Sequence, residues 1–261
     1  MNKLKLGIIG NGYLGEIIAG AWRDGLLPEY ELVGIMGRTK EKTDALANEM
    51  GCKSCSGIGE LLELKPDYVA EAASVASVKD MAEKILTNGS NFIVLSIGAF
   101  ADQEFYEKVK ETAKKHNTRV YIASGAVGGF DVLRTVSLMG EATAGIETRK
   151  GPESLRNTPL FGEHLLTDEE STMVFEGNAK EAIGLLPTKV NVAVASSLAT
   201  AGPDRTKVNI HSVPEMIGDD HKITAEIDGV KAVVDIYSST SAIAGWSVVA
   251  VLQNIVSPVV F

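Results

Sequence analysis

The chain has 261 residues, of which 45% are hydrophobic and 23% charged, which is typical of a globular protein with room for two domains. Its formal net charge is −9 and no basic tract interrupts the sequence, so the composition argues against a nucleic-acid partner. Met1 to Lys5 lead directly into the first apolar run and leave no room for a signal peptide.

The first element is a short apolar run over Leu6–Ile9, which predicts a buried strand. It ends in Gly10-Asn-Gly-Tyr-Leu-Gly15, and the residues behind it are apolar at helical spacing. Strand, glycine turn and helix are the context that a dinucleotide fingerprint requires. Gly10 would make the tight turn, Gly12 would let a pyrophosphate approach the backbone, and Gly15 would let the helix pack on the strand. The phosphates would lie at the positive end of the helix.

The second predicted strand, Glu31–Met36, ends in Gly37-Arg38-Thr39. An NAD-selective fingerprint has an acidic residue here, which hydrogen-bonds the ribose 2′-hydroxyl. This chain has no such carboxylate, and the guanidinium of Arg38 can pair with a 2′-phosphate. We therefore expect NADP to be preferred over NAD, although Arg38 could also be a solvated loop charge that stacks on the adenine.

Cys52 and Cys55 are the only cysteines, in a C-x-x-C spacing. A structural metal site needs four ligands, and no second cysteine pair exists. A thioredoxin-type pair should open a helix, whereas this one enters a predicted strand. We interpret the spacing as coincidental and expect reduced thiols in a cytoplasmic protein.

Strands and helices continue to alternate. Further strands are expected at 53–56, 68–73, 92–95 and 119–123, and helices at 40–50, 58–64, 78–86 and 102–116. This alternation predicts a Rossmann-type doubly wound parallel sheet, an α/β fold, in the first domain. Ligands of such sheets lie beyond the carboxyl ends of the strands, where Ser74, Ser96 and Ala126 are expected to line a cofactor cleft. Each serine could instead be only a helix cap or turn residue.

The pattern changes after Arg134. Strands are expected at 144–149, 172–175, 190–193, 207–210, 222–227 and 231–237, with helices at 178–185 and near 193–200. Many of these strands alternate polar and apolar residues, which predicts a second α+β domain whose sheet has one solvated face. The last helix, 241–255, should pack back on the first domain. Polar residues and a proline interrupt the apolar C-terminus, so we expect a core helix and no membrane span. The expected domains are 1–124 plus 238–261 and 125–237.

The chain has four histidines: His116, His164, His211 and His221. A hydride-transferring enzyme needs an acid–base group, and the residues alone leave both His221 and His211 as candidates. Asp219 and Asp220 precede His221 and could orient it and raise its pKa, or His221 could be a loop residue in an acidic turn. Because adjacent residues rarely converge on one ion, no metal site is expected here.

The chain resembles the L-aspartate dehydrogenase family nearly end to end. The resemblance is carried by Gly10–Gly15, Glu71–Ser74, Ser96–Asp102, Val174–Ala182 and Val190–Ala193, and most specifically by Ser124-Gly-Ala-Val-Gly-Gly-Phe-Asp-Val-Leu133. It implies oxidative deamination of L-aspartate with NAD(P), or the reverse reaction from oxaloacetate and ammonia, and a homodimer. It also implies that His221, in a polar loop after Pro214, is the catalytic histidine. The cofactor contacts that it suggests are Tyr13, Leu14, Ser74, Ser96, Ala126 and Asn191.

Two positions depart from the family's pattern. The family often has an asparagine where Asp219 stands, and an N-P-K-T-S segment where this chain has Tyr237–Ser241 without the lysine. A dicarboxylate needs cationic partners, so both changes act against aspartate. The alternatives are therefore a related dehydrogenase for another amino or imino acid, or a non-catalytic NADP-binding sensor.

Overall fold

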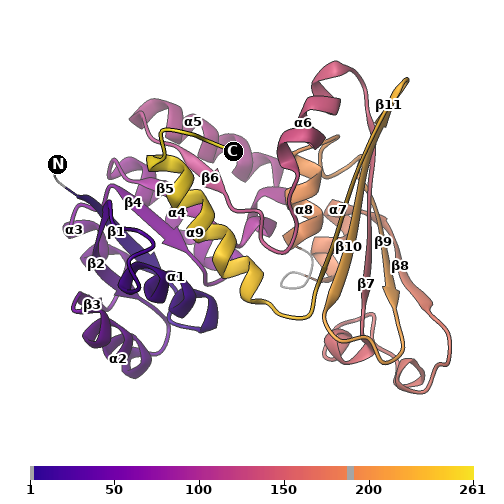
Figure 1. Cartoon of the computed structure of the whole chain (residues 1–261), viewed down its shortest axis with the longest axis horizontal. Helices are drawn as coiled ribbons and strands as arrows, with labels where there is room; N and C mark the ends of the chain where they lie inside the picture. Colours follow the sequence, from indigo (N-terminus) through magenta and orange to yellow (C-terminus); the bar gives the residue numbers. More distant parts are fainter. Residues whose placement is uncertain (1–2, 187–190) are drawn as a thin grey trace. The chain divides into compact units, whose positions relative to one another are not determined.

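The computed structural model describes residues 3–186 and 191–261. They form two compact units, the first made of the chain up to Gly125 together with Ala242–Phe261, the second of Ala126–Ser241. Figure 1 shows each unit built around a sheet of its own.

The first unit contains a six-stranded parallel sheet in the order β3-β2-β1-β4-β5-β6. Its strands are β1 (Leu4–Ile9), β2 (Tyr30–Met36), β3 (Lys53–Cys55), β4 (Tyr68–Glu71), β5 (Asn91–Val94) and β6 (Val120–Ile122). Its helices are α1 (Tyr13–Arg23), α2 (Lys40–Met50), α3 (Ile58–Glu63), α4 (Val75–Thr87), the 3-10 turn η1 (Ile97–Ala101), α5 (Gln103–His116) and α9 (Ala242–Val256). The predicted doubly wound sheet is confirmed.

Helix α9 joins the first unit although it comes from the end of the chain. The hydroxyl of Tyr30, fully buried in β2, donates to the carbonyl of Leu252 over 2.8 Å. Gly245 lies so close to α1 that a Cβ there would stand 3.0 Å from the side chain of Ile17. The backbone N–H of Gly125 donates to the hydroxyl of Ser247 over 3.0 Å, which holds the end of the segment after β6 against α9.

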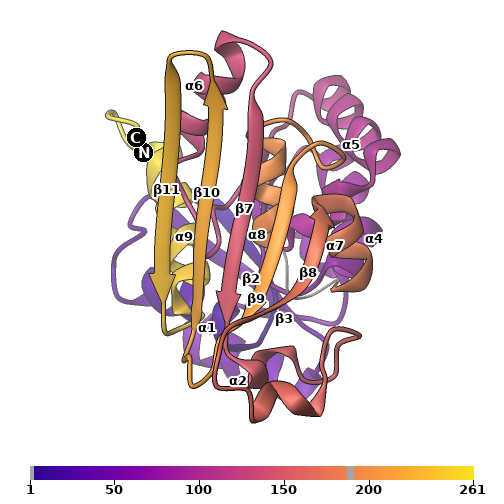
Figure 2. The same cartoon turned by 90° about the vertical axis from the view of Figure 1, so that its right-hand side faces the viewer.

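The second unit contains a mixed five-stranded sheet in the order β11-β10-β7-β9-β8, in which only β7 and β9 run parallel. Its strands are β7 (Thr143–Lys150), β8 (Thr172–Asn178), β9 (Lys207–Ser212), β10 (Asp219–Ile227) and β11 (Val230–Ser238). Its helices are α6 (Phe130–Met139), η2 (Pro152–Leu155), η3 (Glu163–Leu166), α7 (Ala179–Leu185) and α8 (Asn191–Leu198). Figure 2 shows the sheet face-on with α6, α7 and α8 behind it.

Side chains alternate between two faces of the second sheet, as the period of two in a strand requires. On the helix-covered face Ile146, Val208 and Ile223 form a buried cluster with residues of α6, α7 and α8. At one end of this face the buried side chains are polar: Thr148, Lys150, Ser212 and His221. Burying polar side chains costs free energy that apolar side chains would not, so this end of the face is a candidate functional site.

One predicted strand is wrong. Residues 191–193 belong to α8, and Val190 lies outside the described residues. The sequence alternates small apolar residues, which looks like a strand. The five residues from Ala193 to Ser197 are nevertheless all buried, as in a short helix surrounded by protein, and a residue pattern alone does not separate these two cases.

The apolar C-terminal stretch forms the 15-residue helix α9. Among the described residues, none of the helices combines the length and the apolar character that crossing a membrane requires.

Candidate active site

The turn after β1 has the geometry that a dinucleotide requires. Gly10 has φ +126°, a conformation that L side chains rarely adopt, and it lies against the carbonyl of Ala72. A Cβ at Gly15 would overlap the carbonyl oxygen of Gly10, so α1 packs here at backbone distance. A Cβ at Gly12 would meet nothing within 4 Å, which leaves open space at the N-terminus of α1. These residues therefore fit a nicotinamide dinucleotide, whose pyrophosphate would be held by backbone N–H groups.

Asn11 ties this turn to the loop after β2. Its amide nitrogen donates to the carbonyl of Thr39 over 2.7 Å and to the hydroxyl of Thr43 over 2.8 Å. Arg38 lies next to Thr39, is exposed, and has no ion-pair partner among residues 3–186 and 191–261. The guanidinium is thus free to meet an anion beside the turn, where an adenosine ribose of a bound dinucleotide would lie.

Ser74 and Ser96 both follow strand ends in the first sheet. Ser74 is the N-cap of α4, and its hydroxyl accepts from the N–H of Ser77 over 3.1 Å. Ser96 is buried and donates from its hydroxyl to Glu71 Oε1 over 2.7 Å. Both serines therefore have structural partners, and their predicted cofactor contacts remain predictions.

Glu71 is a residue of this strand edge that sequence reasoning did not single out as functional. It is fully buried at the end of β4, and its carboxylate accepts hydrogen bonds from the N–H groups of Ala73, Leu95 and Ser96. Burial raises the pKa of Glu71, and these hydrogen bonds oppose the rise. The carboxylate joins the ends of β4 and β5. Its signal in the sequence is an acidic residue ending an apolar strand.

Three of the remaining predicted cofactor residues lie in the first turns of helices, and Ala126 lies between β6 and α6. Tyr13 and Leu14 form the first turn of α1, with Tyr13 exposed. Ala126 is the first residue of the second unit, and Asn191 begins α8 in that unit. Their contacts with a cofactor remain predictions.

His221 is not in a loop, contrary to the expectation from the family. It is the third residue of β10, its side chain points to the helix-covered face, and it is 2% exposed. Its Nδ1 lies 3.0 Å from the hydroxyl oxygen of Thr148 on the neighbouring strand β7, in register with it. When Nδ1–H donates to Thr148, Nε2 carries the lone pair and can accept a proton.

The pKa of His221 is lowered to about 4, where the two preceding aspartates were expected to raise it. Burial is the main cause, because it disfavours the charged imidazolium. Asp219 opposes this effect, and the positive charge of Lys150 adds to it. Asp220 points to the other face of the sheet, where Asp235 of β11 is its diagonal neighbour and raises its pKa in addition to the effect of burial. His221 is therefore a neutral imidazole near pH 7, the form that serves as a general base.

Lys150 was not found by sequence reasoning. It ends β7 on the same face as Thr148, is 2% exposed, and its ammonium lies 3.3 Å from Asp219 Oδ1 on β10. Thr148 faces His221 and Lys150 faces Asp219 across the two strands, so four polar side chains form two adjacent rows. The sequence signal that could have identified Lys150 is the alternation of side chains along β7, which places Lys150 on the same buried face as Ile146.

The other histidines lie apart from these rows. His211 is in β9 on the outward face, His164 is exposed in η3, and His116 ends α5. Within the described ranges, no group of three or more His, Cys, Asp and Glu residues is arranged to hold a metal ion.

Cys52 and Cys55 are both free thiols. Burial raises the pKa of both, that of Cys52 to about 11. Because the thiolate is the reactive form, neither cysteine has the environment of a redox-active pair.

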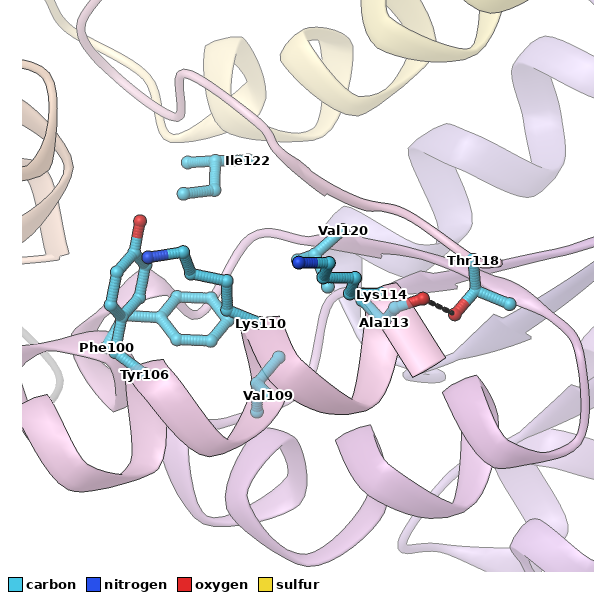
Figure 3. Close-up of a pocket in the computed structure, with 9 residues that line it drawn as sticks. All are labelled: Phe100, Tyr106, Val109, Lys110, Ala113, Lys114, Thr118, Val120 and Ile122. Carbon is cyan, nitrogen blue, oxygen red and sulfur yellow. Dashed lines mark hydrogen bonds between the residues drawn. The ribbon is translucent and has the colours of Figure 1, made fainter. Parts of the chain in front are cut away.

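A cavity of about 350 Å³ lies between α5 and β6 at the edge of the first sheet. Figure 3 shows Phe100 and Tyr106 at one end and Thr118 at the other, with Lys110 and Lys114 between them. None of the predicted cofactor residues lines this cavity, so it is separate from the glycine turn.

Comparisons with known proteins agree with this arrangement. Residues 6–123 match the family model described as the homoserine dehydrogenase NAD-binding domain, and residues 131–255 match the aspartate dehydrogenase C-terminal model. The L-aspartate dehydrogenases of Methanococcus maripaludis and Methanosarcina mazei are each 34% identical to this chain, with 98% of both chains covered. The crystal structure of aspartate dehydrogenase from Thermotoga maritima superposes with a TM-score of 0.81 at 28% identity and 99% coverage of both chains.

A glycine turn built for a dinucleotide, together with a buried neutral histidine, defines the class as NAD(P)-dependent dehydrogenases. Within that class, the full-length matches show that the chain belongs to the aspartate dehydrogenase family, as its sequence motifs predicted. It is an NAD(P)-dependent amino-acid dehydrogenase that acts on a small molecule.

Proposed function

We propose that the protein catalyses the NAD(P)-dependent oxidative deamination of L-aspartate to iminosuccinate, which water converts to oxaloacetate and ammonia, or the reverse reductive amination. The observation that carries the proposal is His221. Burial keeps this histidine neutral, and the hydroxyl of Thr148 orients its ring. Its support comes from the full-length relatives named L-aspartate dehydrogenase.

His221 would act through Nε2. It would take a proton from the water molecule that attacks the imine carbon, and return it to the nitrogen that leaves the carbinolamine. Thr148 holds the ring in one orientation through Nδ1 during both transfers. A nicotinamide dinucleotide held by the glycine turn would supply the hydride acceptor for the substrate Cα, or the hydride donor in the reverse direction.

We assign dinucleotide binding to the first unit, with phosphate contacts at Gly10, Gly12 and Gly15. NADP would be preferred, because Arg38 is an exposed cation beside the turn and the loop after β2 places no carboxylate next to it. Acid–base chemistry, substrate binding and dimerisation belong to the second unit in this proposal.

We propose a homodimer whose interface includes the outward face of the second sheet. Met173, Val233 and Tyr237 point outward from this sheet and are 50%, 48% and 61% exposed. Val233 and Tyr237 lie on the same face of β11, where a pair of exposed apolar side chains favours a protein partner. A cytoplasmic location, where both thiols stay reduced, completes the proposal.

The test is NADPH consumption by the purified protein with oxaloacetate and ammonium, with NADH run in parallel. Turnover that requires both substrates supports reductive amination. We expect His221→Ala to lower kcat by about 10²-fold or more while NADPH still binds. Wild-type rates in His221→Ala would refute the mechanism.

The alternative is a related dehydrogenase for another amino or imino acid, and Asp219 is the observation that favours testing it. A carboxylate at this position repels a dianionic substrate unless a cation offsets it. If the oxaloacetate reaction fails and NADPH binds, a panel of other amino acids becomes the next measurement. Binding with no turnover on any of them would favour the NADP sensor.

A further inference from the structure

Lys150 is the only lysine or arginine among residues 3–186 and 191–261 whose side chain is buried. Removing an ammonium from water is energetically costly, and a single ion pair seldom offsets that cost. Its partner Asp219 keeps 37% of its side chain exposed. An ion pair with one buried and one partly exposed member contributes little to the free energy of unfolding, so stability alone does not account for a buried lysine at this position.

The ammonium has capacity to bind more than Asp219. Lysine has three N–H donors, and within the described residues its polar partner is the carboxylate of Asp219, at 3.3 Å. This distance is long for a charge-assisted hydrogen bond, whose usual range is about 2.7–2.9 Å. A substrate carboxylate could therefore approach the ammonium more closely than Asp219 does.

The pair is adjacent to His221. Lys150 and Thr148 are two residues apart on β7, and Asp219 and His221 are two residues apart on β10, so all four point to one face. The charges of both Lys150 and Asp219 act on the titration of His221. A carboxylate bound by Lys150 would thus lie next to the imidazole.

We propose that Lys150 binds a carboxylate group of the substrate, and that Asp219 is its counter-ion in the absence of substrate, displaced when the carboxylate binds. The inference rests on the proposed function, since it places the substrate beside His221. It also explains how a chain without a lysine in the segment before α9 retains a cation for an acidic substrate.

The two members of the pair have opposite effects on binding in this proposal. Losing the ammonium removes the attraction for the carboxylate. Neutralising Asp219 removes the competitor and frees Lys150. A purely structural ion pair would instead respond to both changes in the same direction, through lower stability.

The test is calorimetric titration of succinate, a dicarboxylate without an amino or keto group, into the full chain with saturating NADPH. Lys150→Met should weaken succinate binding by about 10- to 100-fold, the value of one charge-assisted hydrogen bond. Lys150→Arg should restore part of the affinity. Asp219→Asn should strengthen binding several-fold. Lys180→Met is the matched control, because Lys180 is an exposed lysine of α7 that is ion-paired with Asp204, and this variant should bind as the wild type does.

Wild-type affinity in Lys150→Met, or weaker binding in Asp219→Asn, overturns the inference. So does a wild-type protein that does not bind succinate. If Lys150→Met does not fold, Lys150→Arg and Asp219→Asn still decide the question through the sign of their effects. Because the readout needs no turnover, Lys150-dependent succinate binding without reductive amination refutes the proposed function alone. Turnover of oxaloacetate with Lys150-independent binding refutes this inference alone.

Discussion

The lowered pKa of His221 makes the stability of the protein depend on pH. The group binds its proton at about 6.5 in an unfolded chain and at about 4 in the folded one. Between these values the unfolded state holds more protons, so the free energy of unfolding rises with pH across this window. The contribution is complete above pH 6.5 and is lost as the pH falls towards 4.

The magnitude follows from the shift. A difference of about 2.5 pKa units corresponds to about 3 kcal/mol, of which about 2 kcal/mol is lost between pH 7 and pH 5. Burial of the ring, which is 2% exposed, is the main cause of the lowered pKa, and the charge of Lys150 lowers it further. Since a domain is stable by only about 5–15 kcal/mol, this loss is measurable.

The assay is urea unfolding of the wild type and of His221→Gln at pH 7 and pH 5. Far-UV circular dichroism is the suitable probe. Tryptophan fluorescence would report only on the first unit, which contains Trp22 and Trp246, whereas His221 lies in the second. We expect the wild type to lose about 2 kcal/mol more than the variant between the two pH values. His164→Gln, a change at an exposed histidine, is the control and should follow the wild type. Equal losses in the wild type and His221→Gln would refute the reasoning.

Three further predictions follow from single contacts. Gly15→Ala should abolish NADPH binding or folding, since the new Cβ overlaps the Gly10 carbonyl. Gly59→Ala is the comparison: it has open space around it in α3 and should raise the free energy of unfolding by about 0.5–1 kcal/mol. Thermal unfolding of both variants with and without NADPH measures the two effects. Tyr30→Phe should cost about 1 kcal/mol in urea unfolding, because it removes the buried hydrogen bond that the hydroxyl donates to the carbonyl of Leu252, and an unchanged stability would contradict this. In pH profiles of kcat/KM, the pKa of His221 should rise in Lys150→Met, which loses a positive neighbour, and fall in Asp219→Asn, which loses a negative one. Shifts of this pKa in the same direction in both variants would contradict the assigned effects of the two charges.

The sequence by itself determined the first unit closely. Its strands are short apolar runs, each followed by turn residues and a helical repeat, and such local patterns are sufficient for a parallel sheet buried on both faces. The glycine turn was equally local: Gly10, Gly12 and Gly15 have the conformation and the space that their spacing indicates. Family membership could be read from the sequence too, because it rests on motifs spread along the chain.

The tertiary structure decided what surrounds His221. The segment Gly218-Asp-Asp-His221 by itself is compatible with His221 in a loop or in a strand. It is equally compatible with an exposed ring of raised pKa and with a buried ring of lowered pKa. The answer depends on the register between β7 and β10, which pairs residues about 70 positions apart: Thr148 with His221 and Lys150 with Asp219. Local patterns carry no information on such pairing, because the free energy that selects it comes from burying whole faces of both strands. Only the folded sheet therefore shows that Lys150, separated from His221 in the chain, is its neighbour in space.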